Sequence, residues 1–163
     1  MPLHTNTPGE RTLVFIQPKN GKFLAQIDGQ PQEFEAIEGT LDLVRLEFDP
    51  GNPTYKIQPY DAFIMHIADE DMIYRIKMPV NRNFTFSVAK VLEDIQKGDR
   101  IIAKAKAGSD PTVTFCNMLK LGEDGNWVRP VSREMPDDKD KKIALIRTIV
   151  ESHSAYSEKK EKE

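Results

Sequence analysis

The stretch that decides the fold covers residues 40–121 and opens with a long strand-like run, TLDLVRLEF, at residues 40–48. Its apolar residues change parity between Leu43 and Val44. A parity change inside a strand indicates a bulge or strong coiling, so that one strand can serve two halves of a sheet. A strand buried on both faces is the alternative interpretation of the same run.

More strand-like runs and one helical run follow. They are YKIQ (55–58) continuing as DAFIMHIA (61–68), DMIYRIKM (71–78), the helical run FTFSVAKVLEDIQ (84–96), DRIIAKAK (99–106) and TVTFCNMLKL (112–121). The order is therefore β-β-β-α-β-β, which predicts a mainly β protein with an OB-like five-stranded Greek-key barrel. In many proteins the open face of that barrel binds single-stranded nucleic acid or oligosaccharide. A sandwich or jelly roll is the alternative β-rich fold.

The segments outside this stretch predict two additions to the barrel. Residues 11–17 and 22–27 are rich in β-formers and flank Asn20-Gly21, which predicts an N-terminal β-hairpin. An acidic start followed by an apolar stripe predicts a C-terminal helix over residues 137–157. The expected organisation is a flexible N-terminus (1–10), one barrel domain that includes the hairpin (11–136), the helix (137–157) and a charged tail (158–163).

Composition limits the classes of function. The chain has 163 residues, a net charge of −3 and one cysteine. One cysteine excludes an internal disulfide framework and a multi-cysteine zinc site. The N-terminus has no basic stretch followed by an apolar run, and no segment approaches the roughly 18 apolar residues of a membrane span. We therefore expect a cytoplasmic protein without a membrane partner.

The sequence offers no coherent catalytic set. His4, His66 and His153 have no histidine or cysteine at ligand spacing, and Cys116 lies inside a strand-like run. Turn and helix-start roles account for the acidic residues at 69–71 and 137–138. We therefore expect no enzyme activity, no cofactor and no metal.

Basic and aromatic residues give the functional hypothesis. Binding of a single strand needs cations for phosphates and flat rings for bases. The third and fourth barrel strands carry cations on one parity, and the aromatic residues that could lie between them are Tyr55, Tyr60, Tyr74 and Trp127. The predicted nucleic-acid-binding residues are Tyr55, Trp127, Arg75, Lys77, Lys104 and Lys106, with Arg45, Lys56 and Arg129 as secondary members. The alternative is that the lysines and arginines simply lie on the solvent-exposed face of the sheet, and that the Trp127 ring packs as a lid over the barrel. Tyr74 is expected in the core, and six phenylalanines are expected to pack in the core or the hairpin: Phe15, Phe23, Phe63, Phe84, Phe86 and Phe115.

A resemblance supports the same hypothesis for residues 38–121. The features are Glu38-Gly39-Thr40-Leu41 before a long strand, the pair of strands at 55–78, Arg82-Asn83-Phe84 at the helix start and Lys97-Gly98-Asp99-Arg100 before a strand with alternating lysines. This pattern resembles the phage and bacterial single-stranded-DNA-binding proteins of the OB fold. The resemblance implies non-catalytic binding of single-stranded DNA, with RNA as an alternative, in replication, recombination or repair. The chain lacks the Gly/Pro-rich linker and acidic Pro-Phe tip of the common bacterial version, so recruitment of repair partners through such a tip is not implied.

A second hypothesis is an assembly module with no nucleic-acid role. The hairpin and the last helix would then mediate self-association, as a homo-oligomer, or docking to another protein. The apolar stripe of the helix, Ile143, Ile146, Ile149 and Val150, supports this hypothesis unless it packs on the barrel.

Overall fold

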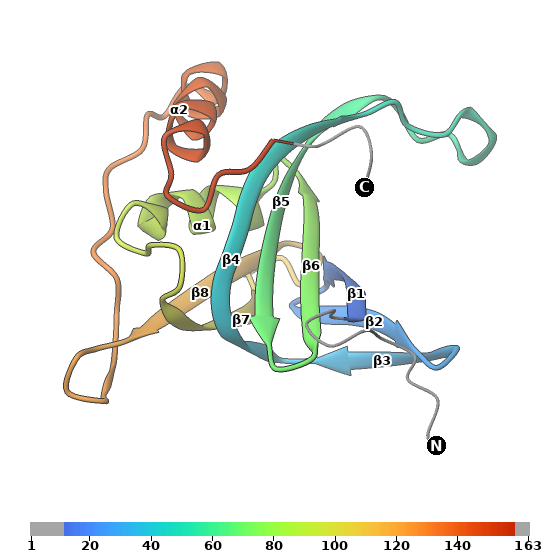
Figure 1. Cartoon of the computed structure of the whole chain (residues 1–163). Coiled ribbons are helices and arrows are strands. Elements are labelled where there is room, and N and C mark those ends of the chain that lie inside the picture. The colour runs from blue at the N-terminus through green and yellow to red at the C-terminus, as the bar shows by residue number, and fades with distance from the viewer. Residues whose placement is uncertain (1–11, 159–163) are drawn as a thin grey trace.

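Residues 12–158 are described by the structure, a computed structural model, and they form nine strands, two α-helices and one short 3-10 helix (Figure 1). The strands are β1 (Thr12–Lys19), β2 (Lys22–Ile27), β3 (Gln30–Phe34), β4 (Ala36–Asp49), β5 (Tyr60–Asp69), β6 (Met72–Pro79), β7 (Arg100–Ala107), β8 (Thr114–Leu121) and β9 (Trp127–Val128). The helices are η1 (Pro53–Tyr55), α1 (Asn83–Leu92) and α2 (Lys139–Glu151). The prediction of a mainly β protein is confirmed. The expected flexible segment 1–10 and residues 159–163 of the expected tail lie outside the described residues.

The described strands form one sheet in the order β3-β2-β1-β6-β5-β4-β7-β8-β9. All neighbours are antiparallel except β1 and β6, which run parallel. The sheet is strongly twisted but is not closed into a barrel, because its end strands β3 and β9 are not paired with each other (Figure 1).

Strand β4 joins the two halves of the sheet. Residues 36–40 pair with β7, and residues 40–49 pair with β5, with a register shift between Leu41 and Leu43. The predicted bulge is therefore confirmed, and it lies just before the point between Leu43 and Val44 where the apolar parity changes. Strand β6 pairs with β5 over residues 62–69, so only the ends of β4 and β5, at 48–49 and 60–61, reach beyond it, and the loop that joins them extends away from the rest of the molecule in Figure 1.

Two boundaries differ from the sequence predictions. Residues 55–58 are not a strand: Asn52 caps the 3-10 helix η1 by accepting a hydrogen bond from the Thr54 N–H, and β5 begins at Tyr60. The sequence predicts no strand at β3, whose residues QPQEF are polar and include a proline. Strand β3 pairs along its length with β2, which explains why this polar segment is extended.

The predicted N-terminal hairpin is confirmed, and it contacts both β8 and α1. Asn20 and Gly21 both have positive φ (52° and 77°), as a tight two-residue hairpin turn requires. The Gly21 N–H donates to Thr114 Oγ1 at 2.9 Å, which ties the hairpin tip to β8. On the inner face, the buried Phe23 ring meets the Phe84 ring of α1 edge to face at 5.9 Å. The hairpin thus spans the space between β6 and β8 and completes the core.

Both helices bury one face. Helix α1, shorter than the predicted 84–96, places Phe84, Val88 and Leu92 in the core. Helix α2 begins after Asp138, whose carboxylate accepts a hydrogen bond from the Lys141 N–H. Three of the four residues of its predicted stripe, Ile146, Ile149 and Val150, are at most 3% exposed, and Ile143 is half-buried against the same core. The stripe therefore packs within the chain, which removes it as a basis for assembly.

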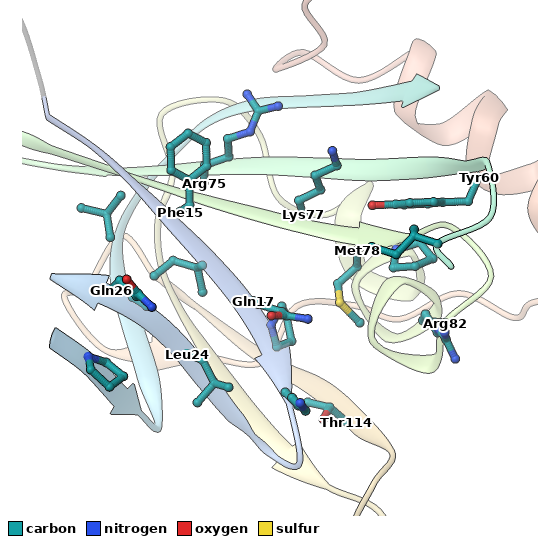
Figure 2. A pocket seen from close by; sticks show the side chains of 18 of the residues that line it. Phe15, Gln17, Leu24, Gln26, Tyr60, Arg75, Lys77, Met78, Arg82 and Thr114 are labelled. Carbon is teal, nitrogen blue, oxygen red and sulfur yellow. The ribbon is translucent and has the colours of Figure 1, made fainter. Parts of the chain in front are cut away.

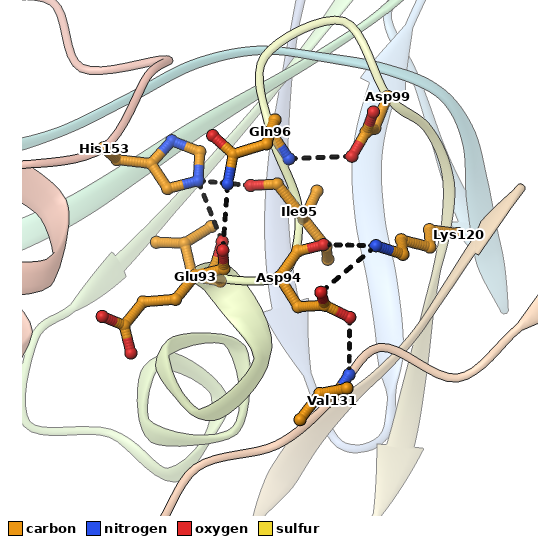
Figure 3. A network of polar contacts seen from close by, with 9 residues as sticks. Glu93, Asp94, Ile95, Gln96, Asp99, Lys120, Val131 and His153 are labelled. Atoms are coloured by element: carbon orange, nitrogen blue, oxygen red, sulfur yellow. Dashed lines mark hydrogen bonds and ion pairs between the residues drawn. The ribbon is translucent and has the colours of Figure 1, made fainter. Parts of the chain in front are cut away.

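A polar network ties the end of α2 to the end of α1 (Figure 3). The Nε2 of His153 lies 2.9 Å from the Leu92 carbonyl and also contacts the Ile95 carbonyl, while its Nδ1 accepts the Ala155 N–H at 3.0 Å. This arrangement assigns the proton to Nε2 and gives His153 a structural role, as expected. The Val44 N–H donates to the Ala155 carbonyl, so the segment after α2 covers the edge of β4 beyond the bulge. Among residues 12–158, no helix has the length and apolarity that crossing a membrane requires.

Candidate functional site

The sheet has an inner face that packs against the helices and an outer face that carries the charged residues. On β6 the inner Ile76 is fully buried, while Arg75 and Lys77 point to the outer face. On β1 the inner Val14 and Ile16 are buried, and the residues between them point outward. The strict alternation of these strands therefore places one polar and aromatic surface across β1 and β6, which are hydrogen-bonded neighbours.

An open groove runs along this surface, with a volume of about 1590 Å³. Its floor comes from β1, β2 and β6, and its walls come from residues 57–60, 79–83 and 112–114 (Figure 2). The volume exceeds the roughly 300–1,000 Å³ of ordinary small-molecule pockets, so the groove suits an extended ligand better than a compact one.

Ion pairs lie along one side of the groove. Lys77 Nζ donates to Asp49 Oδ2 at 2.6 Å, and Arg75 Nη2 lies 3.6 Å from Glu47 Oε2. The Lys77 ammonium, followed by the hydrogen bond from the Gly51 N–H, lowers the pKa of Asp49 below its usual value. Arg75 and Lys77 therefore both have carboxylate partners, and a phosphate must compete with these carboxylates for the two cations.

Aromatic rings lie beside these cations. Phe15 is 66% exposed although it sits in the middle of a strand, and the Arg75 guanidinium carbon is 6.0 Å from the centre of its ring. Lys77 Nζ lies 6.0 Å from the centre of the Tyr60 ring, whose pKa is raised mainly by burial. Figure 2 shows Phe15, Arg75, Lys77 and Tyr60 in one row along the groove. Both pairs have the spacing of a cation–π contact, so each ring is held next to a charge that attracts phosphate.

The predicted binding set omits Phe15 and Tyr60, although Tyr60 is among the aromatic residues that the sequence suggests could lie between the cations. The sequence prediction assigned Phe15 to packing because phenylalanine is most often buried. The alternation of TLVFIQ indicates the opposite, since Val14 and Ile16 share one face of the strand and Phe15 lies on the other, exposed face. Tyr60 is a candidate from its residue type alone, and its position in the groove depends on where β5 begins.

The predicted binding residues divide into two groups. Arg75 and Lys77 line the groove, and Tyr55 and Lys56 lie in the β4–β5 loop whose later residues form one wall. Tyr55 is 74% exposed. Arg45 is 5% exposed and lies 3.4 Å from Glu47, so the structure removes it from the candidate phosphate contacts.

The second group lies away from the groove. Lys104 and Lys106 are exposed on the outer face of β7, and Trp127 and Arg129 lie in and after β9. None of these four residues lines the groove. In the sheet, β7 is separated from β6 by β5 and β4. Trp127 instead pairs in register with Leu121 of β8, and both side chains are more than a third exposed. The structure does not bring the predicted set together on one surface.

The residues considered for chemistry have structural surroundings. Cys116 is buried on the inner face of β8, and burial raises the pKa of its thiol. His66 lies in β5 opposite Arg75, and His153 holds backbone groups as described above. Within residues 12–158, no cluster of three or more histidine, cysteine or acidic side chains has the arrangement of a metal site.

No family model matches the chain, and neither the curated proteins nor the solved structures contain a significant match to it.

Proposed function

We propose that this protein binds single-stranded nucleic acid, DNA with RNA as the alternative, in the groove over β1 and β6 without performing chemistry. The observation that carries the proposal is the exposed Phe15 ring beside Arg75, continued along the groove by Tyr60 beside Lys77. Large apolar rings on a sheet surface are normally buried, and their exposure next to cations is the arrangement that binds bases and phosphates together.

The topology of β4 to β8 supports an OB-like core for this function. In the sheet these strands have the order β6-β5-β4-β7-β8, and α1 lies between β6 and β7 along the chain. If β4 is taken as the first strand, this is the order 3-2-1-4-5 with the helix after the third strand. OB folds bind ligands over strands 2 and 3 and beside the loops that follow strands 1 and 4. The groove lies over β6 and is lined by residues of both corresponding loops, at 57–59 and 112–113.

The energetics indicate that stacking, more than charge, supplies the affinity. Base stacking on an aromatic ring is worth roughly 1–3 kcal/mol per base. Lys77 and Arg75 contribute less than free cations would, because carboxylates lie beside them. We therefore expect binding to oligo-dT that weakens with salt, but less steeply than for a groove of unpaired lysines.

The test is fluorescence anisotropy of labelled oligo-dT at low and moderate salt, with a matched duplex as the competitor. Loss of both rings in Phe15→Ala/Tyr60→Ala should weaken binding at least about tenfold, from two lost stacking contacts. Trp127→Ala is the matched control, since it also truncates an exposed aromatic but lies outside the groove. Circular dichroism should show that all variants fold. Equal affinities of the wild type and the double variant would reject the groove, and no binding at low salt would reject the function.

Self-association or docking of another protein is a second candidate function. The specific observation is the exposed cross-strand pair of Leu121 in β8 and Trp127 in β9, which are 39% and 36% exposed. Exposed apolar patches of this kind mark interaction sites in many proteins. Light scattering of the wild type beside the Trp127→Ala variant tests this candidate: a monomer in both cases removes self-association.

A further inference from the structure

Asp49, at the end of β4, makes two contacts that link the groove to the β4–β5 loop. Its Oδ2 accepts a hydrogen bond from Lys77 Nζ at 2.6 Å, and its Oδ1 accepts the Gly51 N–H at 2.8 Å. The side chains of Lys77 and Asp49 are 32% and 24% exposed, so water screens the pair only in part. The ion pair therefore holds the ammonium on the floor of the groove.

Lys77 is also the cation that a ligand in the groove would meet beside the Tyr60 ring. An ammonium has three donors, but its single charge is already balanced by the Asp49 carboxylate. A phosphate that approaches Lys77 must replace this carboxylate or lie next to it, and either arrangement costs free energy through desolvation or repulsion. The carboxylate thus lowers the affinity of the groove for phosphate.

We propose that Asp49 is the residue that sets the affinity of the groove for phosphate groups, by competing with the ligand for Lys77. The inference rests on the proposed function. A polyanion that offers only phosphates binds weakly to the groove in this arrangement, and a single strand, whose bases stack on Phe15 and Tyr60, supplies the missing free energy.

The loop contact decides which variant tests the proposal. Gly51 has φ +76°, and a Cβ at this position would lie 2.3 Å from the Ile57 carbonyl oxygen, so the turn after Asp49 is tightly specified. Asn at position 49 keeps an oxygen that accepts the Gly51 N–H, and it removes the negative charge that holds Lys77 and that lies near the Tyr60 hydroxyl. Asp49→Asn therefore separates the electrostatic role from the loop geometry.

The experiment compares the wild type with Asp49→Asn, Lys77→Gln and the double variant, by anisotropy of labelled oligo-dT over a series of salt concentrations. Asp49→Asn should bind about three- to fivefold more tightly at low salt, the value of a partly exposed ion pair. Its plot of log affinity against log salt should be steeper by about 0.7, the contribution of one neutralised phosphate of a single strand. In the Lys77→Gln background the same change should give no gain of this size.

Glu70→Gln is the control for the change in net charge, because Glu70 is exposed in the β5–β6 turn and does not line the groove. The inference is overturned if Glu70→Gln raises the affinity for oligo-dT as much as Asp49→Asn does. It is also overturned if Asp49→Asn still raises the affinity in the Lys77→Gln background. If the wild type binds and Asp49→Asn binds no better, the inference fails while the proposed function stands. If neither the wild type nor Asp49→Asn binds oligo-dT at low salt, the inference and the proposed function both fail.

Discussion

Cys116 illustrates at the residue scale how burial removes a reactive group from chemistry. Its side chain is 6% exposed among core residues, and its N–H donates to Ser87 Oγ at 2.8 Å. Burial raises the pKa of the thiol, and the thiolate is the reactive species. The expectation that Cys116 is a sheet residue agrees with its place on the inner face of β8.

The native protein should therefore react with a thiol reagent such as 5,5′-dithiobis(2-nitrobenzoate) more than about a hundredfold more slowly than the unfolded chain, because reaction requires opening of the core. Absorbance of the released thiol, followed in buffer and in denaturant at one pH, gives both rates. A native rate close to the denatured rate would show that β8 opens easily.

Single positions also show what parity could and could not predict. Tyr74 shares the inner face of β6 with Ile76 and packs against the core, as its parity predicted. Phe15 has the opposite parity to Val14 and Ile16, yet its residue type suggested packing. The pattern was therefore more informative than the type, because a sheet edge or groove can leave an apolar side chain exposed while alternation still fixes its direction.

The N-terminal hairpin shows at the element scale how one hydrogen bond can position a whole element. Thr114 is 7% exposed, and its Oγ1 accepts the Gly21 N–H at the hairpin tip. Thr114→Val has nearly the same shape but lacks this acceptor, so the buried N–H loses its partner. The expected cost is about 1–3 kcal/mol of unfolding free energy, the penalty of an unsatisfied buried donor.

Urea denaturation measures the loss, and hydrogen exchange locates it, since the Gly21 amide should lose protection before the amides of β5. Thr112→Val is the control, because Thr112 Oγ1 contacts only the neighbouring Asp110 in an exposed turn. Equal stability of Thr114→Val and the wild type would mean that the apolar contacts of Phe23 alone hold the hairpin.

Helices and strands with a clear apolar periodicity or turn motif could be predicted from the sequence. Elements that form only because a neighbouring strand or a distant side chain contacts them could not. The hairpin, the bulged β4 and the two helices follow from Asn-Gly, a change of parity and helical apolar stripes. Strand β3 has none of these signals and is extended because β2 pairs with it. The end of α1 at Leu92 also depends on tertiary contacts, since the carbonyl groups of Leu92 and Ile95 meet His153 from far along the chain.

Whole-molecule arrangement determines whether separate charges form one site. The parallel pairing of β1 with β6 brings Phe15 to Arg75 across about sixty residues of sequence, and no local pattern specifies this pairing. The same sheet order keeps Lys104 and Lys106 away from the groove, although their spacing matches that of Arg75 and Lys77. Of the residues that the sequence predicts for binding, Arg75 and Lys77 line the groove, and which other residues lie beside them depends on long-range strand pairing that no local pattern specifies.

Ionised carboxylates hold distant parts of the molecule together, which makes stability depend on pH. Asp94, after α1, accepts the Val131 N–H at 2.7 Å and lies 3.3 Å from Lys120 Nζ, so it links α1 to β8 and to the segment after β9 (Figure 3). The Val131 hydrogen bond, and after it Lys120, lowers the pKa of Asp94 below its usual 3.8. A lowered pKa in the folded state means that the unfolded chain takes up the proton first as the pH falls.

The stabilisation from Asp94 should therefore be fully present above about pH 4, the usual range of a carboxyl in the unfolded chain, and should disappear as the pH falls through the lower folded-state pKa. Asp94→Asn removes the charge but keeps an acceptor for Val131, and should cost about 1 kcal/mol at neutral pH, discounted because the side chain is a third exposed. The two unfolding free energies, measured by urea denaturation from pH 7 downward, should converge below pH 4.

Lys120→Met should lose less unfolding free energy than Asp94→Asn over the same pH range, because the Val131 hydrogen bond is the larger cause of the lowered pKa of Asp94. A difference between the wild type and Asp94→Asn that stays constant into acid would mean that packing at this position, and not the charge, joins α1 to the segment after β9.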